Sequence, residues 1–153
     1  MCIRDRLMIE YYEMTNRDID ELSKMYVECF NAEPWNDKWT EETAAKRLLK
    51  MLSYDGAYGI ICRENGNILG MILGHDEYYY DGVNFEIKEF CIRAGIQGKG
   101  TGAKLLKYFE DKLKDKGINK IFLLTCLSDK TVGFYKKNGY NTCHNMIMMD
   151  KKI

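Results

Sequence analysis

The sequence has 153 residues, with 23 basic and 23 acidic side chains, so its formal net charge at neutral pH is zero. This length corresponds to one domain that buries about 68–70% of its unfolded surface. Hydrophobic residues make up 46% of the chain and there is one proline, which argues against disorder. The charge balance argues against a nucleic-acid partner, and no apolar run approaches the roughly 20 residues of a membrane helix. We expect a soluble, cytoplasmic protein without nucleic-acid or membrane partners.

Six cysteines raise the possibility of disulfides or a metal site. No two of them form a CxxC pair, and His75 and His144 are the only histidines. A zinc site needs closely spaced ligands, so we expect no metal. A chain of this length needs no cross-links, and we expect free thiols in a reducing compartment.

The first half of the chain predicts a strand, two helices and three further strands. Residues 1–7 lack periodicity and precede a second methionine, so we expect a non-native or disordered extension there and a single domain over 8–153. Residues 9–14 alternate as a strand, and apolar residues at helical spacing follow over 19–30 and 40–52, with Asn16 or Thr15 suited to cap the first helix and Thr40 the second. Strands over 57–63, 68–80 and 83–92 are joined by Asn65-Gly66 and Asp81-Gly82, both strong hairpin signals.

The second half changes character. A glycine-rich stretch over 93–101 precedes a helix over 102–116, an apolar central strand over 120–126, a short helix over 129–138 and a last strand over 146–149. This order predicts an α+β domain with a mixed, mostly antiparallel central sheet flanked by about four helices, containing one β-α-β unit. The last strand would offer an edge for a homodimer.

The glycine-rich stretch carries the most informative chemistry. In Gln97-Gly98-Lys99-Gly100-Thr101-Gly102, glycines allow successive backbone N–H groups to line one concavity at the start of a helix. Such a loop suits a pyrophosphate. A nucleotide P-loop is excluded because Lys99 precedes Gly100 rather than following it. A dinucleotide fingerprint lacks the acidic residue after the next strand, which ends in Thr125-Cys126.

The pattern Gln-x-x-Gly-x-Gly between a strand and a helix resembles the acetyl-CoA signature of the GNAT N-acetyltransferase family. A second block, Ser128 to Tyr140, is similar to the family's Asn-x-x-Ala-x-x-x-Tyr-x-x-x-Gly-Phe segment. It departs from that segment at Ser128, Thr131 and Tyr140, which replace Asn, Ala and Phe. The resemblance covers most of the chain from about Met8.

The resemblance implies acetyl-CoA as acyl donor and direct attack by an amine in a ternary complex. The pyrophosphate would rest on the loop amides, and the pantetheine arm would lie along the strand that ends at Ile92. A backbone N–H at Cys91 or Ile92 would polarise the acetyl carbonyl. The implied cofactor contacts are Phe90, Cys91, Ile92, Gln97, Gly98, Lys99, Gly100, Thr101, Gly102, Ser128 and Tyr135.

Three side chains are candidates for proton transfer. The resemblance favours Glu89 as the base that accepts the amine proton, with Glu86 as the second candidate. The two are three positions apart in a strand, so we expect them on opposite faces. Tyr135 matches the tyrosine that commonly protonates the leaving thiolate. A nucleophilic Cys91–His75 pair is a weaker interpretation than a buried thiol.

The acceptor site is predicted from aromatic residues beside acids. Trp35 and Trp39 lie near Glu33 and Asp37, in the connection that lines the acceptor cleft in this family. Tyr78 and Tyr80 would flank the other wall. Structural packing is the alternative for both groups.

Aromatic walls beside carboxylates suit a cationic amine, and the segment is loosely similar to small aminoglycoside 6′-N-acetyltransferase-type members. The sequence therefore predicts an N-acetyltransferase acting on a small cationic amine such as an aminoglycoside or polyamine. A protein or peptide acceptor is an open alternative. So is a non-catalytic acyl-CoA-binding or sensory module on the same fold.

Overall fold

The computed structural model describes residues 8–153, which form two compact units, one ending at Leu123 and one running from Leu124 to Ile153. The extension predicted over residues 1–7 lies outside the described residues. The second unit contains one helix, α4 (Asp129–Lys137). The first unit contains β1 (Ile9–Glu13), the short 3₁₀ helix η2 (Asn16–Asp18), α1 (Ile19–Phe30), α2 (Glu41–Leu52), β2 (Ala57–Glu64), β3 (Asn67–Tyr79), β4 (Gly82–Ile92), α3 (Thr101–Asp115) and β5 (Lys120–Leu123).

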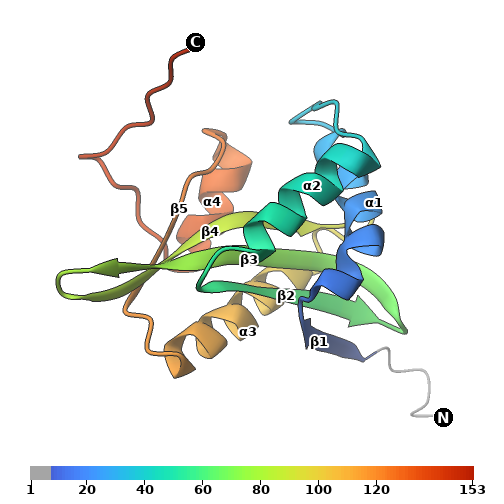
Figure 1. Ribbon diagram of the computed structural model, residues 1–153, viewed down its shortest axis with the longest axis horizontal. Coiled ribbons are helices and arrows are strands. Elements are labelled where there is room, and N and C mark those ends of the chain that lie inside the picture. The colour runs from blue at the N-terminus through green and yellow to red at the C-terminus, as the bar shows by residue number, and fades with distance from the viewer. Residues whose placement is uncertain (1–7) are drawn as a thin grey trace. The chain divides into compact units, whose positions relative to one another are not determined.

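The five strands form one mixed sheet in the order β1-β2-β3-β4-β5. The first three pairings are antiparallel, and β4 pairs with β5 in parallel through the crossover helix α3. Helices α1 and α2 cover one face of the sheet and α3 covers the other (Figure 1). The predicted mostly antiparallel α+β fold with one β-α-β unit is confirmed.

Local signals set most element boundaries. Thr15 caps the 3₁₀ helix, and Thr40 caps α2 in a reciprocal arrangement with Thr43. Asn65 and Gly66 both adopt positive φ, at 52° and 79°, as a two-residue hairpin turn requires. The Thr40 cap and the Asn65-Gly66 turn are confirmed, whereas Thr15 caps the 3₁₀ helix and α1 itself begins after Asp18 without a side-chain cap.

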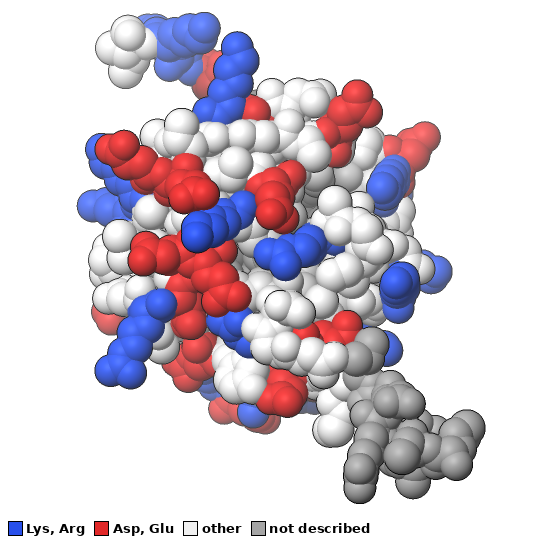
Figure 2. Space-filling model, turned by 90° about the vertical axis from the view of Figure 1, so that its right-hand side faces the viewer, with Lys and Arg blue, Asp and Glu red and all other residues white. Residues whose placement is uncertain are grey.

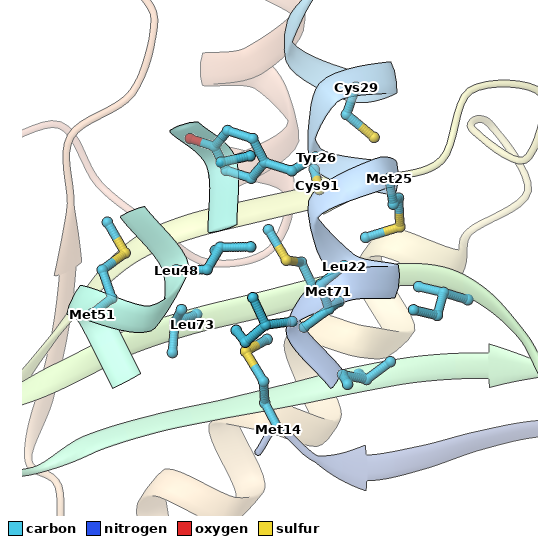
Figure 3. Packing of buried hydrophobic residues seen from close by; sticks show 14 residues of the cluster. Met14, Leu22, Met25, Tyr26, Cys29, Leu48, Met51, Met71, Leu73 and Cys91 are labelled. Atoms are coloured by element: carbon cyan, nitrogen blue, oxygen red, sulfur yellow. The ribbon is translucent and has the colours of Figure 1, made fainter. Parts of the chain in front are cut away.

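A methionine-rich core lies between the α1–α2 pair and the sheet (Figure 3). On the opposite face, Phe109 of α3 packs edge-on against Phe85 of β4, with ring centroids 5.4 Å apart. The side chains buried on the α1–α2 face include Met14, Leu22, Met25, Tyr26, Cys29, Leu48, Met51, Met71, Leu73 and Cys91.

A β-bulge in β4 changes which face its residues point to. Leu73 of β3 opposes Glu89, but Gly74 opposes Ile87, so Lys88 is an extra residue in β4. Before the bulge, Phe85 faces α3, and after it Glu89 bonds to Arg47 of α2. The bulge therefore reverses the side-chain alternation within one strand.

The bulge overturns one sequence expectation. Glu86 opposes His75 and Glu89 opposes Leu73, and these partners are two residues apart on a regular strand. Residues two apart on a regular strand share a face. Glu86 and Glu89 therefore point to the same, α1–α2 side of the sheet, and the expectation of opposite faces is wrong.

Two predicted strands also need correction. The run 120–126 forms only the four-residue β5, which is an edge strand of the described sheet rather than a central one. Residues 146–149 form no strand, and their side chains are 70–83% exposed. A strand needs a hydrogen-bonding neighbour, and four consecutive apolar residues carry no alternation to hold one register. The edge expected to support a homodimer is thus not formed.

None of the helices between residues 8 and 153 has the length and apolar character needed to cross a bilayer. On the face drawn in Figure 2, described Lys and Arg side chains lie among Asp and Glu rather than in one continuous patch. This mixing agrees with the zero net charge of the sequence.

Gly74 sits where the backbones of β3 and β4 come closest. A Cβ atom at this position would lie 1.9 Å from the carbonyl oxygen of Glu86. We predict that Gly74→Ala lowers the free energy of unfolding by about 1–3 kcal/mol, because the strands must separate to accept the methyl group.

Urea unfolding measures this effect as a lower midpoint at unchanged slope. Gly133→Ala is the matched control, since a Cβ on that helical glycine meets nothing within 4 Å. It should raise stability by about 0.4–1 kcal/mol. An unchanged midpoint for Gly74→Ala would contradict the close approach.

Candidate active site

Strand β4 has an open edge over its last residues. On one side β3 pairs with β4 as far as Ile92, whereas on the other β5 pairs only with Asn84 to Ile87. From Lys88 to Ile92, this second edge has no strand neighbour among the described residues. An extended ligand with amide groups is able to add there as a strand would.

The glycine-rich loop follows directly from that open edge. The side-chain amide of Gln97 donates to the carbonyl oxygen of Ile92 at 3.1 Å and so ties the loop to the strand end. Gly95, Gly98 and Gly100 have φ values of 85°, 86° and 79°, in the left-handed region that side chains strain to adopt. The loop conformation therefore explains why these positions are glycine.

Helix α3 begins without a side-chain cap. Its N-cap residue is Gly100, and no side chain bonds to the first turn. Within the described chain, no loop or cap backbone hydrogen bond is donated by the residues between Ile96 and Lys104. The amides of this segment and the helix dipole together form a terminus with the polarity that suits an anion, and the exposed Lys99 lies beside it.

Glu89 is buried between three elements. Its side chain is 6% exposed, and Oε1 accepts from the Tyr26 hydroxyl at 3.1 Å and from Arg47 Nε at 2.5 Å. Burial raises the pKa of Glu89, although the hydrogen bonds from Arg47 and Tyr26 oppose this shift by stabilising the carboxylate. Figure 3 shows the Tyr26 hydroxyl turned away from the methionine cluster, at its rim. The carboxylate thus joins α1 and α2 to β4.

Glu86 lies on the same face in a less enclosed environment. Its side chain is 17% exposed, with one oxygen 3.9 Å from His75 Nε2 and the other 3.5 Å from Lys88 Nζ. The ring of Tyr54, just after α2, packs edge-on against His75. Two carboxylates on one face therefore remain candidates for the base.

Cys91 is not placed for nucleophilic catalysis. It opposes Met71 in the sheet, whereas His75 lies four residues further along β3, or roughly 13 Å at 3.3 Å per residue. The hydrogen bond with Cys29 and burial raise the pKa of the Cys91 thiol well above its ordinary value. Within residues 8–153, no group of three or more potential ligand side chains is gathered to hold a metal.

The two tryptophans belong to a chain of aromatic contacts that leads to Glu89. Trp35 packs edge-on against Phe30, whose ring centroid is 4.5 Å from that of Tyr26. Trp39 packs edge-on against Tyr26 at 5.1 Å. Asn31 holds the backbone of Trp39 through two 2.8 Å hydrogen bonds. The structure therefore brings both predicted acceptor-side tryptophans towards the same carboxylate.

The predicted tyrosine wall is not brought to this place. Tyr78 lines a separate pocket with Phe85 and with Leu113 of α3, on the other face of the sheet from Glu89. Tyr80 lies in the turn that follows β3 and is 90% exposed. That turn consists of Tyr80 and Asp81, one residue earlier than the predicted Asp81-Gly82.

In the second unit, Ser128 and Tyr135 have local partners. The Ser128 hydroxyl caps α4, accepting from the Thr131 amide at 3.2 Å and donating to the Thr131 hydroxyl at 2.8 Å. Tyr135 packs against Phe134 and Tyr140, and burial raises the pKa of its phenol to about 12. The phenol thus retains its proton at neutral pH. The cofactor and catalytic roles of both residues stay predictions.

Sequence reasoning missed Arg47 and Tyr26. Arg47 lies between Ala44 and Met51 at helical spacing, so it falls on the face of α2 that these two residues bury. A charged residue in such a stripe signals a buried partner, because an unpaired charge is costly there. Tyr26 falls among the apolar residues at helical spacing over 19–30, and nothing in that pattern marks its hydroxyl as a partner of Glu89.

Residues 19–140 match the Acetyltransferase (GNAT) family, and the chain therefore belongs to that family. It is 29% identical over 122 residues to the Uncharacterized protein YdhI of Bacillus subtilis (strain 168), covering 79% of this chain and 70% of the relative.

Solved structures share the fold. An aminoglycoside acetyltransferase from an uncultured soil metagenomic sample, in complex with sisomicin, superposes with a TM-score of 0.75 at 16% identity, covering 95% of this chain and 96% of the other. Glucosamine-6-phosphate N-acetyltransferase from Arabidopsis thaliana superposes with a TM-score of 0.70 at 20% identity, covering 95% and 98%. The α+β architecture is thus that of GNAT acetyltransferases.

The raised pKa of Glu89 predicts a pH-dependent stability. The native state keeps the Glu89 proton above pH 4.5, where an unfolded chain loses it. The free energy of unfolding of the wild type, relative to Glu89→Gln, should therefore fall as pH rises from about 4.5 through the raised pKa. Urea unfolding of both proteins between pH 4 and 8 measures the difference.

Glu42→Gln is the control variant. It removes one carboxylate charge at an exposed position on α2, so it measures the effect of the charge loss alone. A wild-type advantage that instead grew with pH over this range would show that the bonds from Arg47 and Tyr26 outweigh burial.

Proposed function

We propose that this protein transfers an acetyl group from acetyl-CoA to a primary amine by direct attack in a ternary complex. The observation that carries the proposal is the open edge of β4, which leads into the glycine loop and the uncapped start of α3. A strand edge and an anion-binding helix terminus, in that order, match the amide-bearing arm and the pyrophosphate of coenzyme A.

The backbone supplies most of the donor site. Amides of Gln97 to Gly102 would bind the pyrophosphate, with Lys99 adding a positive charge. Backbone groups of Phe90 to Ile92 would bind the pantetheine arm, and an N–H at Cys91 or Ile92 would polarise the acetyl carbonyl. Ser128 is a further predicted contact in the second unit.

Side chains would move the two protons. The amine nitrogen attacks the acetyl carbon, and its proton passes to Glu89 or Glu86, directly or through water. The carbon–sulfur bond then breaks, and Tyr135 donates its proton to the leaving thiolate. Glu89 lies nearer along the strand to Cys91, whereas Glu86 is more exposed and has His75 and Lys88 as its charged neighbours.

The acceptor class is proposed at the level of a primary amine. The names of two structural neighbours identify amine substrates, an aminoglycoside in one and an amino-sugar phosphate in the other. The sequence prediction of a small cationic amine rests on Trp35 and Trp39 with the nearby acids. Tyr78 and Tyr80 lie outside this aromatic chain.

A product screen tests the proposal. The protein is incubated with labelled acetyl-CoA and separate pools of aminoglycosides, polyamines, amino acids, amino-sugar phosphates and peptides, and products are identified by mass. Acetylation of one amine class is the expected result. Tight acetyl-CoA binding with no product in any pool would favour the non-catalytic module.

The loop glycines should control donor affinity. An alanine at position 100 is strained at φ of 79°, by about 1–2 kcal/mol. We predict that Gly100→Ala weakens acetyl-CoA binding by about 5–30-fold in calorimetric titration, since the strained loop relaxes when unliganded. Gly66→Ala is the control, because Gly66 has the same φ of 79° in the β2–β3 turn. Equal affinities for the two variants would contradict the loop assignment.

Tyr135→Phe should lower kcat while acetyl-CoA affinity stays nearly unchanged. The reason is that the ring is kept and only the proton donor is lost, and a general acid contributes about 10²–10⁴-fold. Tyr140→Phe is the control, since the family segment carries Phe at this position. Wild-type turnover in Tyr135→Phe would remove the tyrosine from the mechanism.

A further inference from the structure

Arg47 is a fixed cation beside the candidate base. Its Nε bonds to Glu89 at 2.5 Å, and its guanidinium carbon lies 5.7 Å from the centroid of the Trp39 ring. These two contacts hold a planar group from two directions, so its rotamer freedom is already lost before any ligand binds.

Much of this guanidinium remains available. Its Nε bonds to Glu89, the hydroxyl of Tyr26 is a further neighbour, and the side chain is still 39% exposed. The terminal N–H groups of an arginine form a fork that matches two oxygens of a carboxylate or phosphate. The same side chain is thus anchored through Nε and still partly open to solvent.

This arrangement is unfavourable for a second cation. Arg47 offsets the charge of Glu89 and lies over the face of Trp39, which are the two features that would attract an ammonium group. Asp37, an acid of the connection, accepts a hydrogen bond from Trp39 Nε1 at 3.0 Å. The ligand chemistry that complements the available groups is an oxyanion.

We propose that Arg47 determines acceptor specificity by binding a carboxylate or phosphate group carried by the acceptor amine. The inference rests on the proposed acetyltransferase function and names its substrate class as amines that also bear an oxyanion, such as amino acids or amino-sugar phosphates. The aromatic chain from Trp39 to Trp35 would contact the remainder of such a molecule.

Matched acceptor pairs test the proposal with the full chain and acetyl-CoA. Phenylalanine is compared with phenethylamine, and glucosamine-6-phosphate with glucosamine, with spermidine as a cationic reference. We expect kcat/KM to favour the oxyanion-bearing member of one pair by at least tenfold, and the pair that responds identifies carboxylate or phosphate as the group.

Variants assign the preference to Arg47. Arg47→Lys keeps the charge but loses the fork, and should raise KM for the oxyanion-bearing amine at least tenfold, leaving KM for the matched amine without an oxyanion and for acetyl-CoA unchanged. Arg63→Lys is the control, because Arg63 binds Glu21 through two 3.0 Å bonds away from this site. Urea unfolding verifies that each variant is folded.

Two results would overturn the inference while leaving the acetyltransferase proposal intact. One is a wild-type preference for spermidine or for the members that lack an oxyanion. The other is an equal loss for both members in Arg47→Lys, which would show that Arg47 acts only through Glu89.

If no amine is acetylated, the acetyltransferase proposal fails. The oxyanion site at Arg47 is then tested separately, by ligand binding. Calorimetric titration then compares N-acetylphenylalanine and N-acetylglucosamine-6-phosphate with N-acetylphenethylamine. Tenfold tighter binding of one anionic ligand, lost in Arg47→Lys, would support the oxyanion site, and equal binding of all three would exclude it.

Discussion

The extra residue in β4 is the constraint on which the candidate site depends. Without Lys88 as an unpaired residue, the alternation that buries Phe85 and Ile87 against α3 would carry Glu89 and Cys91 to the same face. The bulge instead turns the odd-numbered residues of β4 from the α3 face, where Phe85 lies, to the α1–α2 face, where Glu89 and Cys91 lie. The protein thus places a carboxylate under α1 and α2 while keeping a continuous sheet.

The buried carboxylate then defines how the helices meet the sheet. A charge inside a core is costly unless hydrogen-bonded partners compensate for it, and Glu89 receives one partner from α1 and one from α2. Both of these partners, Tyr26 and Arg47, also contact Trp39 of the α1–α2 connection. Packing and chemistry are therefore not separable here, because a shift of either helix changes the environment of the candidate base.

Local features were predictable from the sequence and longer-range ones were not. The Thr40 cap, the Asn65-Gly66 turn and the glycine loop each depend on a few neighbouring residues with known backbone preferences. The bulge depends on a close approach between Gly74 and the Glu86 backbone, which no local pattern in β4 indicates. Arg47 was visible only as a charge in an apolar stripe, and its partner lies 42 positions away. The predicted last strand failed because apolar content alone does not supply a pairing neighbour.

Donor and acceptor recognition would draw on different parts of the chain. The loop and the open strand edge present backbone amides, whose geometry depends on φ values rather than on side-chain identity. The acceptor side consists of side chains from α1, α2 and their connection, anchored to β4 through one carboxylate. Substitutions on the helices are then able to alter acceptor choice without disturbing the amides that bind the donor. In the proposal made above, Arg47 would set acceptor specificity, because it is anchored to a buried carboxylate while its own side chain is 39% exposed.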